Sequence, residues 1–207
     1  MNARAIRAVL SRRSFRCWLR CVVASAAIAG SAAVLAQSPP KPESAAPFVA
    51  TPTAIVDEML ALAAVGPGDF VVDLGSGDGR LVISAVTRYK ARGGFGVDID
   101  PALVKLANDN ARSAGVSDRV QFFERDLFKT DVSEATVVTL YLLPKVMGRV
   151  EKKLFAELKP GTRIVAHDYE FPGIAPEKLV ELDALDKLRI AGTTYTRLWL
   201  YRVPERR

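Results

Sequence analysis

Residues 70–80 constrain the fold more than any other part of the chain. They read Phe-Val-Val-Asp-Leu-Gly-Ser-Gly-Asp-Gly-Arg. The apolar run from Phe70 to Leu74 is typical of a central parallel strand that is covered on both faces. Three glycines in the next five residues let the backbone turn sharply and approach a ligand where a Cβ would clash. A helix beginning at Arg80 would direct its free N–H groups toward that ligand, so the stretch predicts a cofactor loop.

The glycine spacing and two acidic residues indicate which kind of ligand the loop binds. Dinucleotide loops have the spacing G-x-G-x-x-G, whereas Gly75, Gly77 and Gly79 follow G-x-G-x-G. Asp73 precedes the turn and Asp78 lies within it, so a pyrophosphate placed there would meet carboxylates, which is electrostatically unfavourable. A ligand with cationic groups fits better, and S-adenosylmethionine (SAM) carries an ammonium and a sulfonium. A dinucleotide site and a turn without a ligand are the alternatives.

The loop is similar to a known motif. Its sequence D-L-G-S-G-D-G-R resembles motif I of the class I SAM-dependent methyltransferases. The resemblance implies that SAM is bound by the loop residues Asp73, Gly75, Ser76, Gly77, Asp78 and Gly79. It also implies an α/β fold with a Rossmann-like seven-stranded sheet, mostly parallel with an antiparallel C-terminal strand, and with helices on both faces.

An acidic residue ends the second predicted strand. This strand covers residues 95–98, after a break at Gly93 and Gly94, and Asp98 lies 23 residues after the first loop glycine. In dinucleotide-binding folds, an acid about 20 residues past the loop hydrogen-bonds the ribose diol, so we expect Asp98 to bind the cofactor ribose. The alternative is an acid that complements a helix N-terminus. Asp100 fits that alternative better, because Pro101 opens the next helix.

Asp126 follows the third predicted strand, which covers residues 120–124. In class I methyltransferases an acid at this place commonly contacts the adenine amino group, so the resemblance implies that role for Asp126. A solvated turn aspartate is the alternative interpretation.

The remaining patterns complete one α/β domain and bring further polar residues to the same edge. Helices are predicted over residues 53–64, 80–89, 101–114 and 145–158, and strands over 135–140, 163–166, 178–182 and 195–203, with a turn at Gly192. The fourth strand leads to Tyr141 and the fifth to His167 and Asp168. Open α/β sheets bind ligands at this carboxyl edge.

Tyr141 and His167 are the candidate catalytic residues. An amine acceptor must lose a proton before methyl transfer, which desolvation or a nearby acid or tyrosine can assist. For Tyr141 the alternative is an aromatic wall of the pocket. For His167, the single histidine of the chain, the alternative is a hydrogen-bonded structural role. With one histidine and no cysteine after Cys21, we expect no metal site.

The loop and the hydrophobic-proline motif at residues 140–144, Leu-Tyr-Leu-Leu-Pro, extend the resemblance. They resemble small methyltransferases related to the ATP-synthase c-subunit lysine methyltransferases of mitochondria. This resemblance implies methyl transfer to a protein lysine, with a membrane protein as a candidate partner. A small-molecule methyltransferase and a non-catalytic exported binding module are the alternatives.

The basic charge of the chain is confined to its first residues. Residues 1–36 hold six arginines and no acidic residue. Removing these six from the 29 basic residues leaves 23, which equals the 23 acidic residues. Residues 37–207 are therefore formally neutral and lack the net basic charge typical of nucleic-acid-binding proteins, so no nucleic-acid partner is expected.

The chain divides into a leader, a linker and the methyltransferase domain. Residues 1–36 join an arginine-rich start to an alanine-rich apolar run, which predicts a signal peptide or an N-terminal anchor. Residues 11–15, Ser-Arg-Arg-Ser-Phe, resemble the twin-arginine export signal. Residues 37–52 contain five prolines and predict an extended linker before the domain at 53–207. The expected location is exported, periplasmic or anchored at the inner membrane, and cytoplasmic if the leader is not used.

Overall fold

The computed structural model describes residues 49–184 and 193–205. The predicted leader, the linker up to residue 48 and the predicted turn at Gly192 lie outside the described residues. Within the described ranges, no helix combines the length and the apolar character that a membrane span requires.

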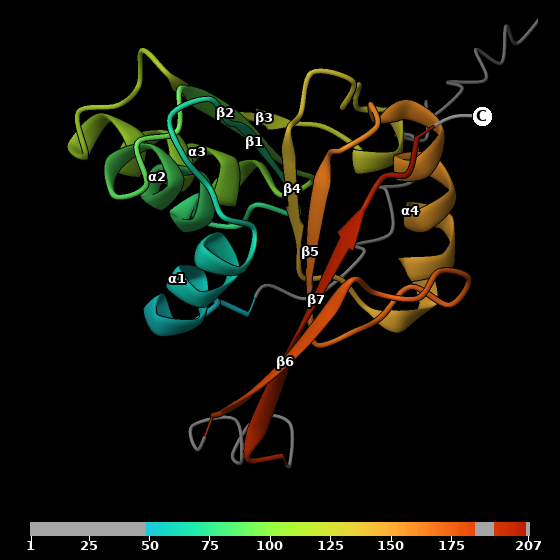
Figure 1. The fold of residues 1–207 in the computed structure, drawn as a ribbon. Helices are drawn as coiled ribbons and strands as arrows, with labels where there is room; N and C mark the ends of the chain where they lie inside the picture. The colour runs from blue at the N-terminus through green and yellow to red at the C-terminus, as the bar shows by residue number, and fades with distance from the viewer. Residues whose placement is uncertain (1–48, 185–192, 206–207) are drawn as a thin grey trace, which may run out of the picture. The chain divides into compact units, whose positions relative to one another are not determined.

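A seven-stranded sheet forms the centre of the domain (Figure 1). Its strand order is β3-β2-β1-β4-β5-β7-β6. The parallel strands are β1 (Phe70–Leu74), β2 (Gly93–Asp98), β3 (Val120–Glu124), β4 (Val137–Leu140) and β5 (Arg163–His167). β7 (Tyr195–Arg202) runs antiparallel between β5 and β6 (Lys178–Asp183). The predicted Rossmann-like sheet with an antiparallel C-terminal strand is confirmed, and its strand order reverses between β1 and β4, where such folds bind ligands.

Helices cover both faces of the sheet, as predicted (Figure 1). α1 (Thr53–Leu62), α2 (Arg80–Thr87) and α3 (Pro101–Ser113) pack on one face, and α4 (Pro144–Glu157) packs on the other. Strand side chains alternate between the two cores because successive residues point to opposite faces. Thus Val71 joins the core beneath α1 to α3, whereas Val72 joins the core beneath α4.

The predicted break at Gly93 and Gly94 is wrong, because β2 begins at Gly93. A Cβ on Gly94 would lie 2.2 Å from the carbonyl oxygen of Val71 and 2.9 Å from Cγ1 of Val82. These glycines therefore let β1 and α2 approach β2 closely instead of interrupting it. The other boundaries lie within two residues of the prediction, and the chain forms no long helix between β5 and β6, as expected.

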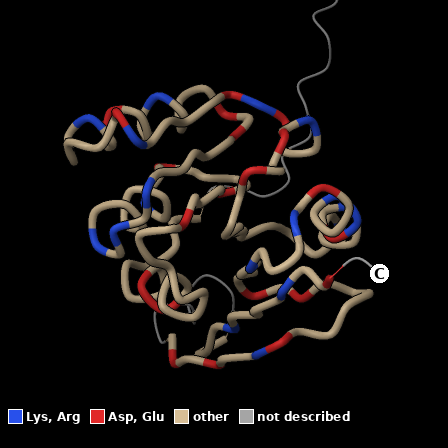
Figure 2. Tube along the Cα trace, turned by 45° about the horizontal axis from the view of Figure 1, so that its top comes forward, with Lys and Arg blue, Asp and Glu red and all other residues tan. Residues whose placement is uncertain are grey.

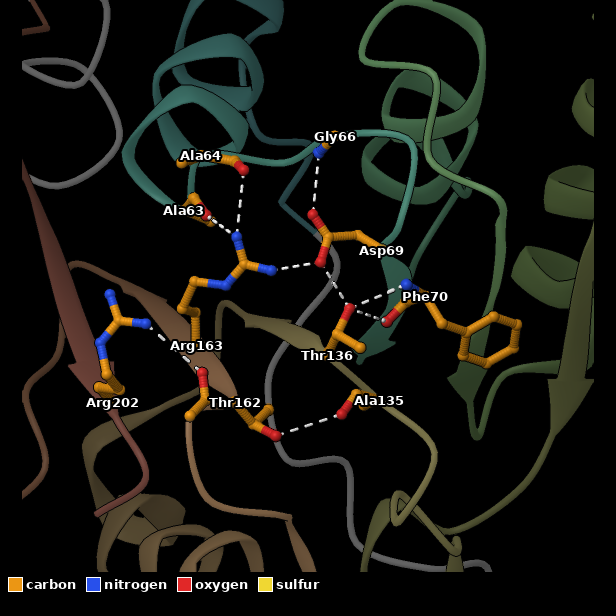
Figure 3. A network of polar contacts seen from close by, with 11 residues as sticks. Ala63, Ala64, Gly66, Asp69, Phe70, Ala135, Thr136, Thr162, Arg163 and Arg202 are labelled. Atoms are coloured by element: carbon orange, nitrogen blue, oxygen red, sulfur yellow. Dashed lines mark hydrogen bonds and ion pairs between the residues drawn. The ribbon is translucent and has the colours of Figure 1, made fainter. Parts of the chain in front are cut away.

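A polar network joins the end of α1 to the amino ends of β1, β4 and β5 (Figure 3). Arg163 forms an ion pair with Asp69 and donates a 2.6 Å hydrogen bond to the carbonyl oxygen of Ala63. The Asp69 carboxylate also accepts from Thr136 Oγ1 at 2.7 Å and from the Gly66 N–H at 2.8 Å. This network ties the C-terminal end of α1 to the amino edge of the sheet. The chain just before α1 contacts Arg80 at the opposite, carboxyl edge.

Candidate functional site

The glycine loop has the backbone geometry that its sequence predicts. Gly75, Gly77 and Gly79 have φ values of +85°, +53° and +83°, in the left-handed region that favours glycine. The N–H groups of Gly75 and Ser76 both donate to the carbonyl oxygen of Val97, at 2.9 Å. The loop therefore folds over the end of β2, and α2 begins directly after it.

Asp73 is a buried carboxylate at the end of β1. Its side chain accepts a 2.7 Å hydrogen bond from Thr139 Oγ1 on the neighbouring strand β4. Burial is the main cause that raises the pKa of Asp73 to about 7. The Thr139 hydrogen bond lowers the pKa, and the charges of Asp98 and Asp78 raise it. A cationic group would therefore be favoured beside Asp73, because it would compensate the cost of burying this negative charge.

Asp78 lies in the loop with its charge already matched by a neighbour. Arg80 Nε donates to Asp78 Oδ1 at 2.9 Å, and Arg80 Nη1 donates to the carbonyl oxygen of Thr51 at 2.7 Å. The backbone of Thr51, just before α1, is thus bound to the start of α2. A contact between Asp78 and the cofactor stays a prediction, and its pairing with Arg80 holds the loop against the chain that enters α1.

Asp98 lies where the spacing rule predicts, at the tip of β2 and beside the loop. Its Oδ2 accepts from the Gly77 N–H and its Oδ1 from the Asp100 N–H, both at 3.0 Å. Asp100 caps α3 by accepting from the Ala102 N–H at 2.9 Å, in agreement with the role that its position before Pro101 indicates. The ribose contact of Asp98 stays a prediction.

Asp126 begins the 3₁₀ helix η1 (Leu127–Lys129). Its Oδ1 accepts from the Phe128 N–H at 2.8 Å, which is the hydrogen bond of a turn-forming aspartate. This geometry accounts for a structural role, and the adenine contact stays a prediction.

The loop also contains a buried hydroxyl group. Ser76 is 5% exposed, and its Oγ has no hydrogen-bond partner among the described residues. A buried hydroxyl without a partner costs free energy, which a ligand can recover by bonding to it. Together with the negative charge at Asp73, this hydroxyl fits a cofactor that carries both cationic and hydrogen-bonding groups.

The two candidate catalytic residues lie next to each other. Leu140 pairs with Ala166 between β4 and β5, so Tyr141 and His167 follow side by side at the carboxyl edge. Their ring centroids are 4.0 Å apart. Leu140 also pairs with Leu74 on β1, so Tyr141 leaves the sheet beside the point where the glycine loop begins.

Asp168 completes this cluster from the first position after β5. Burial, the charge of Asp168 and a hydrogen bond with Asp168 raise the pKa of Tyr141 above its ordinary value. Asp168 itself has a φ of +66° and receives a 2.7 Å hydrogen bond from Thr196 Oγ1 on β7. Thr196 Oγ1 also lies 2.7 Å from His167 Nε2. The structure therefore joins a tyrosine, a carboxylate, a hydroxyl and an imidazole at one edge.

The sequence analysis did not identify the two threonines that hydrogen-bond to the site residues, Thr139 and Thr196. Thr139 looks like an ordinary core position within a β-branched strand, and Thr196 looks like one member of an alternating strand. Their partners depend on which strands pair, so no local pattern could have identified them. Within the described ranges, no three His, Cys, Asp or Glu side chains form a group able to hold a metal ion.

Comparisons with known proteins identify the family. The ANTKMT methyltransferase domain family matches residues 73–178. A protein-lysine N-methyltransferase from Saccharolobus islandicus is 39% identical over 137 residues, which cover 66% of this chain and 85% of that protein. The ATP-synthase c-subunit lysine N-methyltransferase of Homo sapiens is 34% identical over 134 residues, which cover 63% of this chain and 55% of that protein. The chain thus spans little more than half the length of the human relative.

A similar protein has been solved with the product of the cofactor bound. The crystal structure of an RNA methyltransferase from Salinibacter ruber in complex with S-adenosyl-L-homocysteine is similar with a TM-score of 0.69 and 46% sequence identity. The match covers 77% of this chain and 96% of that one. The family match at residues 73–178 includes the glycine loop and the residues that follow β4. The chain therefore belongs to the ANTKMT methyltransferase domain family and is a SAM-dependent methyltransferase with the class I fold.

Proposed function

We propose that the domain transfers the methyl group of SAM to the side-chain amine of a protein lysine. The observation that carries the proposal is the pair formed by Tyr141 and Asp168 beside the exit of β1. A carboxylate next to a protonated phenol attracts a lysine ammonium and would repel the phosphates of a nucleic acid. The relatives named as protein-lysine methyltransferases support the same acceptor.

We assign cofactor binding to the loop and to the two acids that follow later strands. The residues are Asp73, Gly75, Ser76, Gly77, Asp78, Gly79, Asp98 and Asp126. When bound, SAM supplies a methyl carbon that an amine lone pair can attack in line, with a neutral thioether as the leaving group. Asp73 and the Ser76 hydroxyl offer negative charge and a hydrogen-bonding group to the cofactor.

The acceptor side of the site orients the amine and receives its proton. Asp168 attracts the lysine ammonium, and its carboxylate is the group that can accept the proton from the acceptor Nζ. The raised pKa of Tyr141 keeps its hydroxyl protonated at neutral pH, so its oxygen can accept a hydrogen bond from the acceptor amine. The Tyr141 ring packs against the buried His167 ring, with the centroids 4.0 Å apart, and the Tyr141 ring excludes water from one side of the nitrogen.

An RNA acceptor is the second candidate, because the similar solved protein is described as an RNA methyltransferase. Two observations favour the lysine over RNA. Residues 37–207 are formally neutral, and Figure 2 shows basic and acidic residues interspersed along the described trace. An extended basic stripe is the usual electrostatic footprint of RNA binding.

Labelled methyl transfer tests the proposal directly. The full chain is incubated with methyl-labelled SAM and, separately, with a membrane-protein fraction, a soluble-protein fraction, total RNA and a metabolite extract. We expect label in protein, recovered as methyl-lysine by mass spectrometry, and most strongly in the membrane fraction. Label found only in RNA or only in metabolites would refute the lysine acceptor and identify the other class of acceptor. Asp168→Asn should lose the transfer and keep SAM binding, whereas the remote variant Thr162→Val should keep both.

We also propose that residues 1–36 direct the domain to the exported side of the membrane or anchor it there. The six arginines and the apolar run support this proposal. The mature N-terminus, read by sequencing protein from cells, should be Gln37 if a signal peptide is cleaved. An N-terminus at Met1 in protein from the membrane fraction would instead indicate an anchor. The same N-terminus in soluble cytoplasmic protein would refute both.

A further inference from the structure

Thr196 connects His167, the last residue of β5, with Asp168, the residue directly after it. Its Oγ1 lies 2.7 Å from His167 Nε2 and 2.7 Å from Asp168 Oδ1. Thr196 is 0% exposed and His167 is 1% exposed, so the bond between them is shielded from water. Thr196 lies on β7, 28 residues from Asp168 along the chain.

The chemistry of the three groups gives these hydrogen bonds a direction. The Thr196 hydroxyl has a single proton, which it donates to Asp168 Oδ1. Its oxygen can then act only as an acceptor toward the imidazole. His167 Nε2 must therefore carry a proton and donate it, so the chain runs from His167 through Thr196 to Asp168.

The backbone around Asp168 also depends on β7. Its φ of +66° is uncommon for a residue other than glycine, and its N–H donates a 2.7 Å hydrogen bond to the carbonyl oxygen of Arg197. The Trp199 Nε1–H donates to the carbonyl oxygen of Asp168 at 3.2 Å. β7 thus holds Asp168 by its main chain and, through Thr196, by its carboxylate.

We propose that Thr196 is a positioning residue that aims the Asp168 carboxylate at the acceptor amine, and that His167 acts through Thr196 without touching the acceptor. The proposal rests on the proposed function, because Asp168 is the group assigned to the acceptor. In this proposal His167 fixes the orientation of the Thr196 hydroxyl. The hydroxyl in turn holds the Asp168 carboxylate in the orientation in which it bonds to Tyr141. A loose carboxylate would misplace the acceptor nitrogen relative to the transferred methyl group.

The hydrogen-bond direction can be tested without knowing the acceptor. The chain has a single histidine, so labelling histidine with ¹⁵N in the full chain reports on one imidazole only. Long-range ¹H–¹⁵N spectra should show Nε2 protonated, with its proton protected from exchange in wild type and Thr196→Ser. The protection should be lost in Thr196→Val. An unprotonated Nε2 in the wild-type protein would overturn the proposal, and this measurement needs no variant to fold.

Kinetics then test the positioning role on whichever acceptor the wild type methylates. Thr196→Val should lower kcat by roughly 10- to 100-fold with unchanged SAM affinity, and Thr196→Ser should stay within about 3-fold of wild type. Thr162→Val is the matched control, because Thr162 is also buried and hydrogen-bonded but directly precedes β5, at the amino edge of the sheet. An unchanged kcat in Thr196→Val, or an equal loss in Thr162→Val, would refute the role. Methylation of RNA instead of lysine, with the histidine spectrum as expected, would refute the lysine acceptor and leave this hydrogen-bond chain standing.

Discussion

The strongest prediction concerns the charge of Asp73. Its pKa of about 7 means that the folded domain without ligand holds this carboxyl partly protonated at neutral pH. If a cationic group of SAM lies against the carboxylate, binding requires the ionised form and expels the remaining proton. SAM affinity should therefore rise about tenfold per pH unit below about 7 and level off above it.

The same pKa makes the stability of the ligand-free domain change with pH in the opposite direction to SAM affinity. Because the folded-state pKa lies above the ordinary value of 3.8, the free energy of unfolding falls as pH rises from about 4 to about 7. Because Asp73 is only 3% exposed, the rise of its pKa to about 7 lowers the free energy of unfolding above pH 7 by ~4 kcal/mol. Asp73→Asn removes this cost. The buried amide N–H group of the asparagine adds a desolvation cost of about 1–3 kcal/mol, which offsets part of the gain. The variant should therefore be more stable by about 1–3 kcal/mol and bind SAM roughly 10- to 100-fold more weakly.

Isothermal titration of SAM between pH 5 and 7.5 measures the first effect. The range ends there because an α-amino group loses its proton near pH 8. Titrations in two buffers of different ionisation enthalpy count the protons released, and urea unfolding at pH 7.5 measures the second effect. An affinity that does not change over this range, or an Asp73→Asn variant that is less stable than wild type, would refute the reasoning.

Three other predictions test separate parts of the structure. Gly96→Ala places a Cβ 2.4 Å from a loop side chain and should weaken SAM binding about tenfold or more, whereas Gly68→Ala has open space and should not. Arg163→Met leaves the Asp69 carboxylate unpaired and should lower the free energy of unfolding by roughly 2–4 kcal/mol in urea, with unchanged SAM affinity. Tyr141→Phe should lower kcat by roughly 10- to 100-fold, and the wild-type rate should show no break from the phenol below about pH 10, because the pKa of Tyr141 is raised. A break near pH 8 that Tyr141→Phe removes would contradict this assignment.

Most of the secondary structure could be predicted because it depends on local patterns. The apolar run of β1, the proline in the first turn of α4 and the glycine just before α2 each act within a few residues. The exception is instructive. Gly93 and Gly94 look like a break in sequence, but the close approach of Val71 and Val82 makes glycine necessary inside a strand.

The arrangement of charge in the site could not be predicted in the same way. From sequence, Asp78 looks like a free acid in the loop, but Arg80 binds its carboxylate and also reaches the backbone of Thr51. Asp126 likewise uses its side chain to cap a short 3₁₀ helix. Such pairings depend on side-chain directions, which spacing along the chain does not specify.

The sequence alone was sufficient for the class of fold, the conformation of the glycine loop and the edge of the sheet at which Tyr141 and His167 lie. Glycine conformation, strand propensity and the succession of elements along the chain are encoded over short stretches, so they can be read without coordinates. Only the tertiary structure decided which side chains meet there. Asp73 meets Thr139 across 66 residues, and Thr196 meets Asp168 across 28, because strand register brings distant residues into contact. The glycine loop can therefore be recognised from sequence, whereas the hydrogen bonds that join His167, Thr196 and Asp168 require the folded sheet.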